Sequence, residues 1–182
     1  MAAIRIAPTD ALSPSVLRDL RAMLDAAFAD AAGDAAFTDD DWQHAIGGVH
    51  VWLSDGDRVV SHASLVERTM VCAGTRLGAG YVEAVATLAA RRREGHGTTV
   101  VRRVGELIRE RYPVGVLSTG AHPFYERLGW ERWRGPTFVS AAHGLERTPD
   151  DDGGIMILCT PHTPVLDLDE AIVCDWRRGD VW

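Results

Sequence analysis

The sequence contains no lysine, so all of its 19 basic residues are arginine, and 26 acidic residues outnumber them to give a net charge of −7. Nucleic-acid binding needs clustered positive charge, so this balance argues against a nucleic-acid partner. It favours a cationic partner instead. The simpler interpretation is that the negative charge only keeps the protein soluble.

Cysteines and long apolar runs are also scarce. Cys72, Cys159 and Cys174 are too few and too scattered for a disulfide framework or a zinc site, and the histidines show no ligand spacing. We therefore expect no metal. No apolar run approaches the roughly 20 residues that span a bilayer, and the N-terminus lacks a signal pattern. These absences lead us to expect a reduced, cytoplasmic protein with no membrane partner.

What is present is typical of a globular protein, with 46% hydrophobic and 25% charged residues in a chain of 182. There is no internal repeat and no linker. At roughly 100–200 residues per domain, we expect residues 1–182 to form a single domain.

Local patterns predict alternating strands and helices. Ser13 followed by Pro14 is typical of a helix start, and Thr38 with Asp41 resembles a capping box. An apolar stripe from Val100 to Ile108 predicts a third helix, and Pro123–Leu128 a short fourth one. Strands are predicted at Ile4–Ile6, His50–Leu53, Arg58–Ser64, Ser64–Val71, Arg76–Thr87, Val114–Leu117, Trp130–Trp133 and Ile155–Leu158. This order indicates a mixed α/β sheet.

The segment with the clearest chemistry lies between the strand that ends at Thr87 and the third helix. Its glycines let backbone N–H groups point into one concavity, and the helix start adds free donors and partial positive charge. Such a loop can hold a pyrophosphate, with arginines adding charge-assisted contacts. A glycine turn with a solvated arginine run is the simpler alternative. The residues are Arg92, Arg93, Glu94, Gly95, His96, Gly97 and Thr98.

A second pattern, Phe124 to Trp130, places Tyr125 on a short helix further along the chain. Together the two patterns resemble the GCN5-related N-acetyltransferase (GNAT) superfamily. The resemblance implies an α/β GNAT fold, with a mixed central β-sheet splayed at the acetyl-CoA site and flanked by helices. It implies pantetheine along Val85, Ala86 and Thr87, and pyrophosphate on the glycine loop.

The same resemblance places the thioester near the Tyr125 hydroxyl. A phenol with a pKa near 10 is a suitable proton donor to the departing thiolate. The alternative is a buried aromatic residue with a satisfied hydroxyl group.

Further motifs are similar to the aminoglycoside 2′-N-acetyltransferases within that superfamily. This likeness implies acetyl-CoA-dependent acetylation of the 2′-amine of an aminoglycoside-type antibiotic, with resistance as the outcome, and a homodimer. The motifs are Trp42 with Gly47-Gly48 and His50, the segment Gly80–Ala86, Gly135-Pro136-Thr137, Thr148–Gly153 and the tail Cys174–Trp182.

Glu83 borders the expected acetyl site, and the likeness makes it the general base that deprotonates the ammonium, directly or through water. Burial would raise its pKa toward a useful range; the alternative is a solvent-facing strand acid. The likeness also implies antibiotic contacts from Asp41, the Ala84 backbone, Ser118, Asp151, Asp180 and the carboxylate of Trp182. It assigns a catalytic role to the Trp182 carboxylate as well. We expect Asp39, Asp40, Asp150 and Asp152 to cap or solvate.

Two positions depart from the family pattern. Ala36 stands where an acid is usual, and Ala84 follows Glu83 where glycine is usual. A missing acid favours a substrate with fewer or differently placed amines, such as kasugamycin rather than a deoxystreptamine antibiotic, unless Asp34 substitutes for it. The added methyl group would narrow the cleft.

Two other functions remain open. The chain could acetylate another amine, such as a polyamine, or it could bind the antibiotic without turnover. Both Glu83 and Tyr125 favour turnover, and the motif region has no cysteine to form an acyl-enzyme, which favours direct transfer. A housekeeping role with incidental drug acetylation also remains open.

Overall fold

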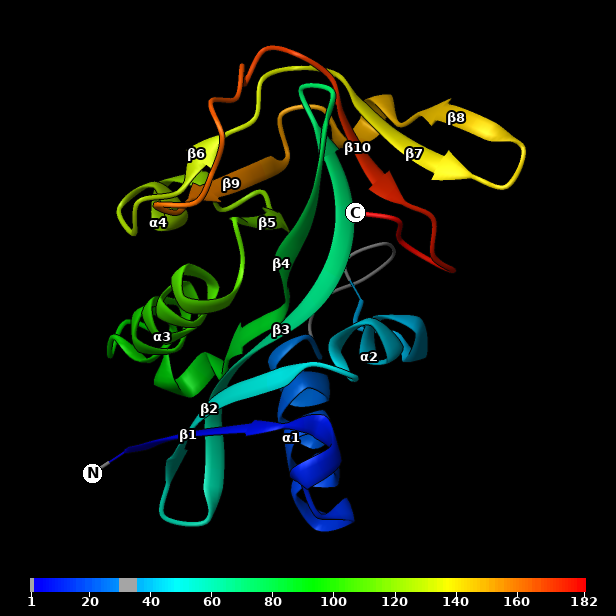
Figure 1. The fold of residues 1–182 in the computed structure, drawn as a ribbon. Helices are drawn as coiled ribbons and strands as arrows, with labels where there is room; N and C mark the ends of the chain where they lie inside the picture. The colour runs from blue at the N-terminus through cyan, green and yellow to red at the C-terminus, as the bar shows by residue number, and fades with distance from the viewer. Residues whose placement is uncertain (1, 30–35) are drawn as a thin grey trace. The chain divides into compact units, whose positions relative to one another are not determined.

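The computed structural model describes residues 2–29 and 36–182, so Asp34 lies outside the described residues. The chain divides into two compact units, residues 1–66 with 82–104 and residues 67–81 with 105–182. Three elements contribute residues to both units: β3 (Arg58–Cys72), β4 (Thr75–Thr87) and α3 (His96–Arg111) (Figure 1).

The first unit is built on an antiparallel arrangement of strands. β1 (Ala3–Pro8) pairs with β2 (Val49–Asp55), and β2 pairs with the first part of β3. The β2–β3 hairpin turns at Gly56, whose φ of 59° lies in the left-handed region that glycine adopts without strain. A short 3-10 turn, η1 (Thr9–Ala11), follows β1.

Both helices between β1 and β2 begin at the predicted caps. α1 (Pro14–Ala27) starts after Ser13, whose side chain accepts from the Val16 N–H. α2 (Asp39–Ala45) starts at a full capping box, in which Thr38 and Asp41 satisfy each other's backbone N–H groups. The predictions for these two helix starts are confirmed.

The prediction of separate strands at Arg58–Ser64 and Ser64–Val71 is wrong, because β3 runs unbroken from Arg58 to Cys72. The change of pattern has a physical reason. From Val59 to Leu65 every residue is buried, whereas beyond it buried and more exposed residues alternate. One strand therefore carries two kinds of sequence pattern.

In the second unit the strand order is β6-β9-β5-β4-β3-β10-β7-β8. The sheet is mixed, since β4 pairs with β5 in parallel over Ala79–Tyr81 and β10 pairs with β7 in parallel. The pairs β10–β3, β5–β9, β6–β9 and β7–β8 are antiparallel. The remaining elements are β5 (Val114–Ser118), α4 (His122–Glu126), β6 (Glu131–Arg132), β7 (Thr137–Ala141), β8 (Gly144–Arg147), the 3-10 turn η4 (Pro149–Asp151), β9 (Ile155–Cys159) and β10 (Ile172–Asp175).

The sequence patterns did not predict β7, β8 or β10. They predicted a four-residue strand at Trp130–Trp133, whereas β6 has only two residues. β8 is exposed along its whole length at the edge of the sheet. β10 has only four residues. Short strands and exposed edges lack the apolar alternation that identifies a strand in a sequence.

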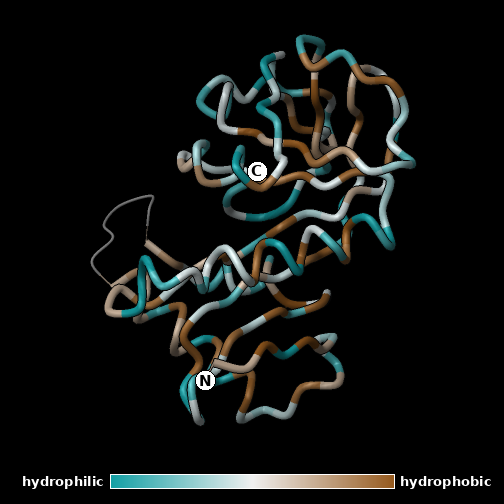
Figure 2. The backbone as a smooth tube through the Cα atoms, turned by 90° about the vertical axis from the view of Figure 1, so that its left-hand side faces the viewer, coloured by the Kyte–Doolittle hydropathy of each residue, from teal (hydrophilic) through white to brown (hydrophobic). Residues whose placement is uncertain are grey.

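Hydrophobic residues lie mainly along the strands and on one side of the long helices, as the brown segments of Figure 2 show. The buried side chains include Leu20 and Leu24 of α1, Val104 and Ile108 of α3, and Ile157 of β9. Within the described parts of the chain, no helix has the length and apolar character needed to cross a membrane.

A test of the packing uses Gly135, where a methyl group would lie 1.8 Å from the Glu170 carbonyl oxygen. We expect Gly135→Ala to lower the free energy of unfolding by about 2 kcal/mol or more, because a backbone atom cannot move aside. Gly120 has nothing within 4 Å of the same position. Urea unfolding of Gly120→Ala should therefore match the wild type, and equal stability of both variants would contradict this account.

Candidate functional site

The last residues of β4, in the first unit, have an unusual backbone. Ala84 has a φ of 49°, the left-handed region that costs an L-residue roughly 1–2 kcal/mol. Glu83, beside it, is half-buried. A strained peptide persists only where its surroundings fix it, so neighbouring contacts must hold Ala84 in place.

Those contacts come from three side chains of β3. They bond to three carbonyl groups of β4 at distances of 2.9–3.3 Å: Ser64 to Glu83, His62 to Ala84 and Ser61 to Ala86. Ser61 also lies 2.9 Å from the Thr87 hydroxyl. The path of β4 through Glu83 is therefore fixed by polar side chains as well as by apolar packing.

Next to this segment lies a groove of about 410 Å³ in the first unit. Its walls are mostly alanine and short side chains, which leave room for a slender ligand. The lining residues are Ala26, Ala27 and Phe28 from α1 and its end, and Val85, Ala86, Thr87, Ala89 and Arg92. The predicted cofactor residues Val85, Ala86, Thr87 and Arg92 thus share one groove.

The glycine loop leads from the 3-10 turn η3 (Ala89–Arg91) to α3. Arg93 and Gly95 both have a positive φ, of 66° and 83°, and α3 then begins at His96. The first N–H groups of a helix have no acceptor inside it. The predicted residues from Arg92 to Thr98 therefore form a loop and helix start that suit an anion.

The sequence reasoning missed the role of Arg91. Its guanidinium bonds to Glu94 and to Asp55, both at 2.9 Å, and Glu94 also lies 3.1 Å from His96. The Arg91 guanidinium lowers the pKa of the Glu94 carboxyl. Glu94 and His96 thus use their side chains to shape the loop, which leaves their backbone groups for a ligand.

Asp41, one of the predicted antibiotic contacts, lies in the first unit. Its carboxylate accepts from the Thr38 N–H at 2.7 Å and from the Thr38 hydroxyl at 2.8 Å. Asp39 is paired with Arg21 at 3.0 Å.

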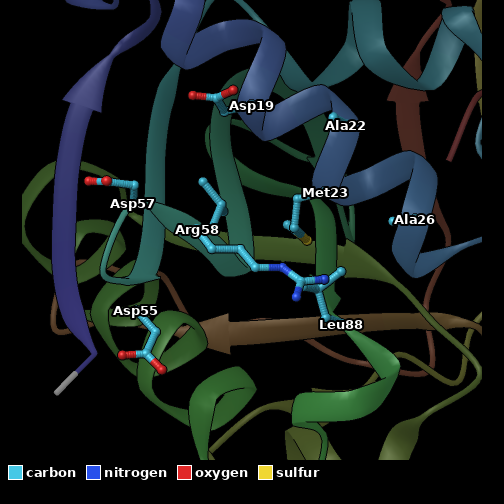
Figure 3. A pocket seen from close by; sticks show the side chains of 9 residues that line it. Asp19, Ala22, Met23, Ala26, Asp55, Asp57, Arg58 and Leu88 are labelled. Atoms are coloured by element: carbon cyan, nitrogen blue, oxygen red, sulfur yellow. The ribbon is translucent and has the colours of Figure 1, made fainter.

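A larger cavity, of about 520 Å³, lies between α1 and the end of the β2–β3 hairpin (Figure 3). The Arg58 side chain extends across it toward Leu88, and Asp19, Asp55 and Asp57 lie around it. Within residues 2–29 and 36–182, no group of three or more His, Cys, Asp or Glu side chains is arranged to hold a metal.

Tyr125 belongs to the second unit. It lies on α4 with 6% of its surface exposed, edge-on to the rings of Phe124 and Trp130. Burial raises the pKa of its hydroxyl well above the ordinary value. Tyr125 therefore stays protonated at neutral pH and is able to donate a proton.

The predicted polar residues of the second unit gather around the turn that contains Asp151. Burial, and then the charge of Asp180, raise the pKa of the Asp151 carboxyl. Ser118 ends β5 opposite Ile155, close to Gly154 of the same turn. Two nearby carboxylates and a hydroxyl form a group that suits an ammonium ion.

The neighbouring Asp152 has a different role. Its carboxylate accepts from the backbone and hydroxyl of Thr137, and Arg147 pairs with it. The Arg147 bond lowers the pKa of Asp152 to about 2. Asp152 is therefore a structural residue that links Thr137 and Arg147, which goes beyond the capping or solvating role expected of it.

The tail is fixed by a set of hydrogen bonds within the second unit. The Trp182 ring is 3% exposed, its indole N–H donates to Thr148 at 2.9 Å, and its backbone N–H donates to Asp180 at 3.0 Å. Arg177 donates to the Trp182 main-chain oxygen at 3.0 Å.

Arg68, which the sequence reasoning did not single out, anchors the same tail. It is 5% exposed, donates to the Val181 carbonyl at 2.8 Å and pairs with Asp175 at 3.0 Å. Its guanidinium also lies over the Tyr81 ring. The sequence signal that could have identified Arg68 is a charged residue within the predicted strand Ser64–Val71.

The chain is similar to known proteins in both sequence and fold. The model of the acetyltransferase (GNAT) domain matches residues 9–133. An aminoglycoside 2′-N-acetyltransferase of Mycolicibacterium fortuitum is 38% identical over 98% of this chain and 91% of that protein.

Among solved structures, a GNAT family acetyltransferase from Brucella melitensis in complex with acetyl-CoA is similar at a TM-score of 0.59, with 18% identity over 91% of this chain and 94% of that one. A GCN5-related N-acetyltransferase from Kribbella flavida matches at a TM-score of 0.58, with 20% identity over 74% of this chain, which spans 34% of that protein. At these identities the two structures establish the fold. The chain belongs to the GNAT acetyltransferases and, within them, to the aminoglycoside 2′-N-acetyltransferase family.

Proposed function

We propose that this protein transfers the acetyl group of acetyl-CoA to the 2′-amino group of an aminoglycoside-type antibiotic and so confers resistance. The observation that carries the proposal is the 38% identity with an aminoglycoside 2′-N-acetyltransferase over 98% of the chain. The family model runs through residues of both units. This supports one catalytic domain over residues 1–182; a homodimer in the cytoplasm remains a prediction.

Acetyl-CoA supplies the acetyl group as a thioester. The groove along Val85, Ala86 and Thr87 has the small lining that a pantetheine arm needs. We assign the pyrophosphate to the loop from Arg92 to Thr98, because its helix start offers free N–H donors and Arg92 borders the groove.

In the proposed reaction Glu83 takes a proton from the 2′-ammonium, directly or through water. The free amine attacks the thioester carbon, a C–N bond forms, and the C–S bond breaks. Tyr125 donates its proton to the departing thiolate, and its raised pKa keeps that proton available. The products are the N-acetylated antibiotic and CoA.

The other ammonium groups of the substrate need anionic partners. We assign Asp151, Asp180 and the Trp182 carboxylate to them, with Ser118, Asp41 and the Ala84 backbone as further contacts. The raised pKa of Asp151 supports this, because a cation beside the Asp151 and Asp180 carboxylates would relieve their mutual repulsion.

The first test measures CoA-thiol release with acetyl-CoA against gentamicin, kasugamycin and amikacin. Gentamicin offers a 2′-amine on a deoxystreptamine scaffold, kasugamycin a 2′-amine without it, and amikacin a 2′-hydroxyl. We expect turnover of one or both 2′-amine compounds and none of amikacin, and the ratio reports which scaffold Ala36 and Ala84 accommodate. If none of the three compounds causes CoA release while acetyl-CoA still binds, the antibiotic assignment is refuted.

A second test replaces Glu83 by Gln, which keeps the shape of the side chain but cannot accept a proton. We expect kcat/KM for the amine to fall by about a hundredfold or more, while acetyl-CoA affinity in calorimetry stays unchanged. Glu131→Gln, an exposed acid on β6, is the matched control. Wild-type turnover by the Glu83→Gln enzyme would rule Glu83 out as the base.

A third test replaces Tyr125 by Phe. Loss of the proton donor should lower kcat by about a hundredfold with little change in either KM. Because the Tyr125 pKa is raised above its usual value of about 10, wild-type kcat should show no basic limb from this group below about pH 10. Tyr112→Phe, at a half-buried tyrosine beyond α3, is the control. A wild-type kcat in Tyr125→Phe would contradict the assignment of Tyr125 as proton donor, and a basic limb near pH 8 that the substitution removes would contradict its raised pKa.

A further inference from the structure

A buried hydrogen-bonded chain in the first unit ends on the strained residue beside Glu83. Thr9 Oγ1 lies 3.0 Å from His50 Nε2, His50 Nδ1 lies 2.9 Å from His62 Nε2, and His62 Nδ1 lies 2.9 Å from the Ala84 carbonyl oxygen. Both histidines are 0% exposed. This hydrogen-bonded chain starts at Thr9, just after β1, continues through His50 on β2 and His62 on β3, and ends at Ala84 on β4 (Figure 1).

The direction of these hydrogen bonds follows from their last acceptor. A carbonyl oxygen can only accept, so His62 Nδ1 carries a proton and donates it to Ala84. Burial lowers the pKa of His50 to about 4 and that of His62 to about 3, so both rings are neutral at pH 7. A neutral ring has one N–H group. His62 Nε2 therefore accepts from His50 Nδ1, and His50 Nε2 accepts from the Thr9 hydroxyl.

The opposite direction would leave two acceptors facing each other. If the Thr9 hydroxyl donated to the Gly48 carbonyl, 3.1 Å away, each histidine would carry its proton on Nε2. His62 Nδ1 and the Ala84 oxygen would then meet at 2.9 Å without a proton between them. The Gly48 carbonyl already accepts the Thr9 backbone N–H at 2.9 Å, so it does not need the hydroxyl.

The two ends of the chain exclude a role in proton transport. At its start the Gly47 backbone N–H donates to Thr9 Oγ1 at 3.0 Å, and at its end is the Ala84 carbonyl. A backbone amide and a backbone carbonyl exchange no protons with a reaction at neutral pH. The hydrogen bonds therefore run in one fixed donor-to-acceptor direction, from Thr9 to Ala84. Their effect is a hydrogen bond of defined position on the Ala84 carbonyl.

That hydrogen bond acts on a backbone that needs support. Ala84 has a left-handed φ of 49°, which an alanine adopts at a cost of roughly 1–2 kcal/mol. A buried hydrogen bond to a backbone carbonyl is worth a comparable amount, about 1 kcal/mol, and leaving that carbonyl unpaired costs about 1–3 kcal/mol. The bond from His62 is therefore large enough to decide which conformation the Ala84 peptide adopts.

We propose that Thr9, His50 and His62 are positioning residues for acetyl transfer, which hold the Ala84 peptide in its left-handed conformation and thereby direct Glu83 and the start of the Val85–Thr87 groove. This inference rests on the proposed function of Glu83. No atom of the three side chains needs to touch either substrate. His62 acts on the backbone, and His50 and Thr9 fix the tautomer of His62.

The first experiment does not depend on activity. Two-dimensional ¹⁵N–¹H NMR of histidine-labelled protein reports which ring nitrogen carries the proton. We expect His50 and His62 both to carry it on Nδ1 at pH 7, and each assignment is checked in a His50→Asn or His62→Asn variant. A proton on Nε2 of His62 would overturn the proposal, whatever the enzyme acetylates.

The second experiment uses pairs of variants. Thr9→Val removes the hydroxyl while keeping its shape, and Thr9→Ser keeps the hydroxyl. His62→Phe removes both ring nitrogens, whereas His62→Asn keeps a donor for the Ala84 carbonyl. We expect the first member of each pair to lower kcat for a 2′-amine by about tenfold or more, and the second to recover most of the loss.

A double-mutant cycle separates positioning from loss of stability. Glycine adopts a left-handed backbone without strain, so the His62→Phe loss should shrink by about fivefold in an Ala84→Gly background. Val51→Ala, a fully buried truncation on β2, is the control for destabilisation and should combine additively with Ala84→Gly. All rates are measured below the unfolding temperature of each variant.

The outcomes separate this inference from the proposed function. Two results would overturn the positioning role while leaving the acetylation reaction in place. One is an equal loss of kcat in His62→Phe and His62→Asn, and the other is that the effects of His62→Phe and Ala84→Gly on kcat simply add in the double variant. If no 2′-amine is turned over, the proposed function fails, and the same cycle is then read in acetyl-CoA affinity, where additivity would again overturn the inference.

Discussion

The need to satisfy buried polar groups determines the path of the strand that carries Glu83. Ser61, His62 and Ser64 lie on the fully buried part of β3, and each bonds to a carbonyl of β4. Burying a hydroxyl or imidazole without a partner costs more than a typical hydrogen bond gains. β4 therefore cannot shift along β3 without leaving several polar groups unpaired at once. This constraint holds both Glu83 and the groove residues that follow it, so the proposed base and the proposed acetyl-donor groove share one support.

The second unit solves a similar problem with a charge. Arg68 is a buried guanidinium, and a buried cation needs acceptors for its donors. The tail supplies them through Asp175 and the Val181 carbonyl, and Arg177 bonds to Trp182 in turn. A chain end normally frays, but here its last residue has a fixed place beside Thr148. Burial of the Arg68 charge thus fixes the tail, which carries Asp180 and Trp182 of the proposed amine site.

Much of the fold was predictable from short-range chemistry. The caps at Ser13 and Thr38, the glycine loop and the helix of Tyr125 all rest on residues a few positions apart, and local geometry determines them. The histidine chain was not predictable, because its consecutive members Thr9, His50, His62 and Ala84 are separated by 12 to 41 positions and meet only after β2, β3 and β4 have assembled. The left-handed Ala84 was hidden for the same reason, since alanine gives no local signal for a positive φ.

The proposed function needs sites for opposite charges, and the two units differ in the charges they offer. The loop from Arg92 to Thr98 offers backbone N–H groups and arginine, and its one acid, Glu94, is paired with Arg91. The second unit offers Asp151, whose pKa is raised by burial and then by the charge of Asp180, so a cation beside the two carboxylates would be stabilised. The net charge of −7 does not by itself identify a partner, but the local placement of charge fits the proposal. Arg92 borders the proposed acetyl-donor groove, and Asp151 and Asp180 interact with each other where the amine is proposed to bind.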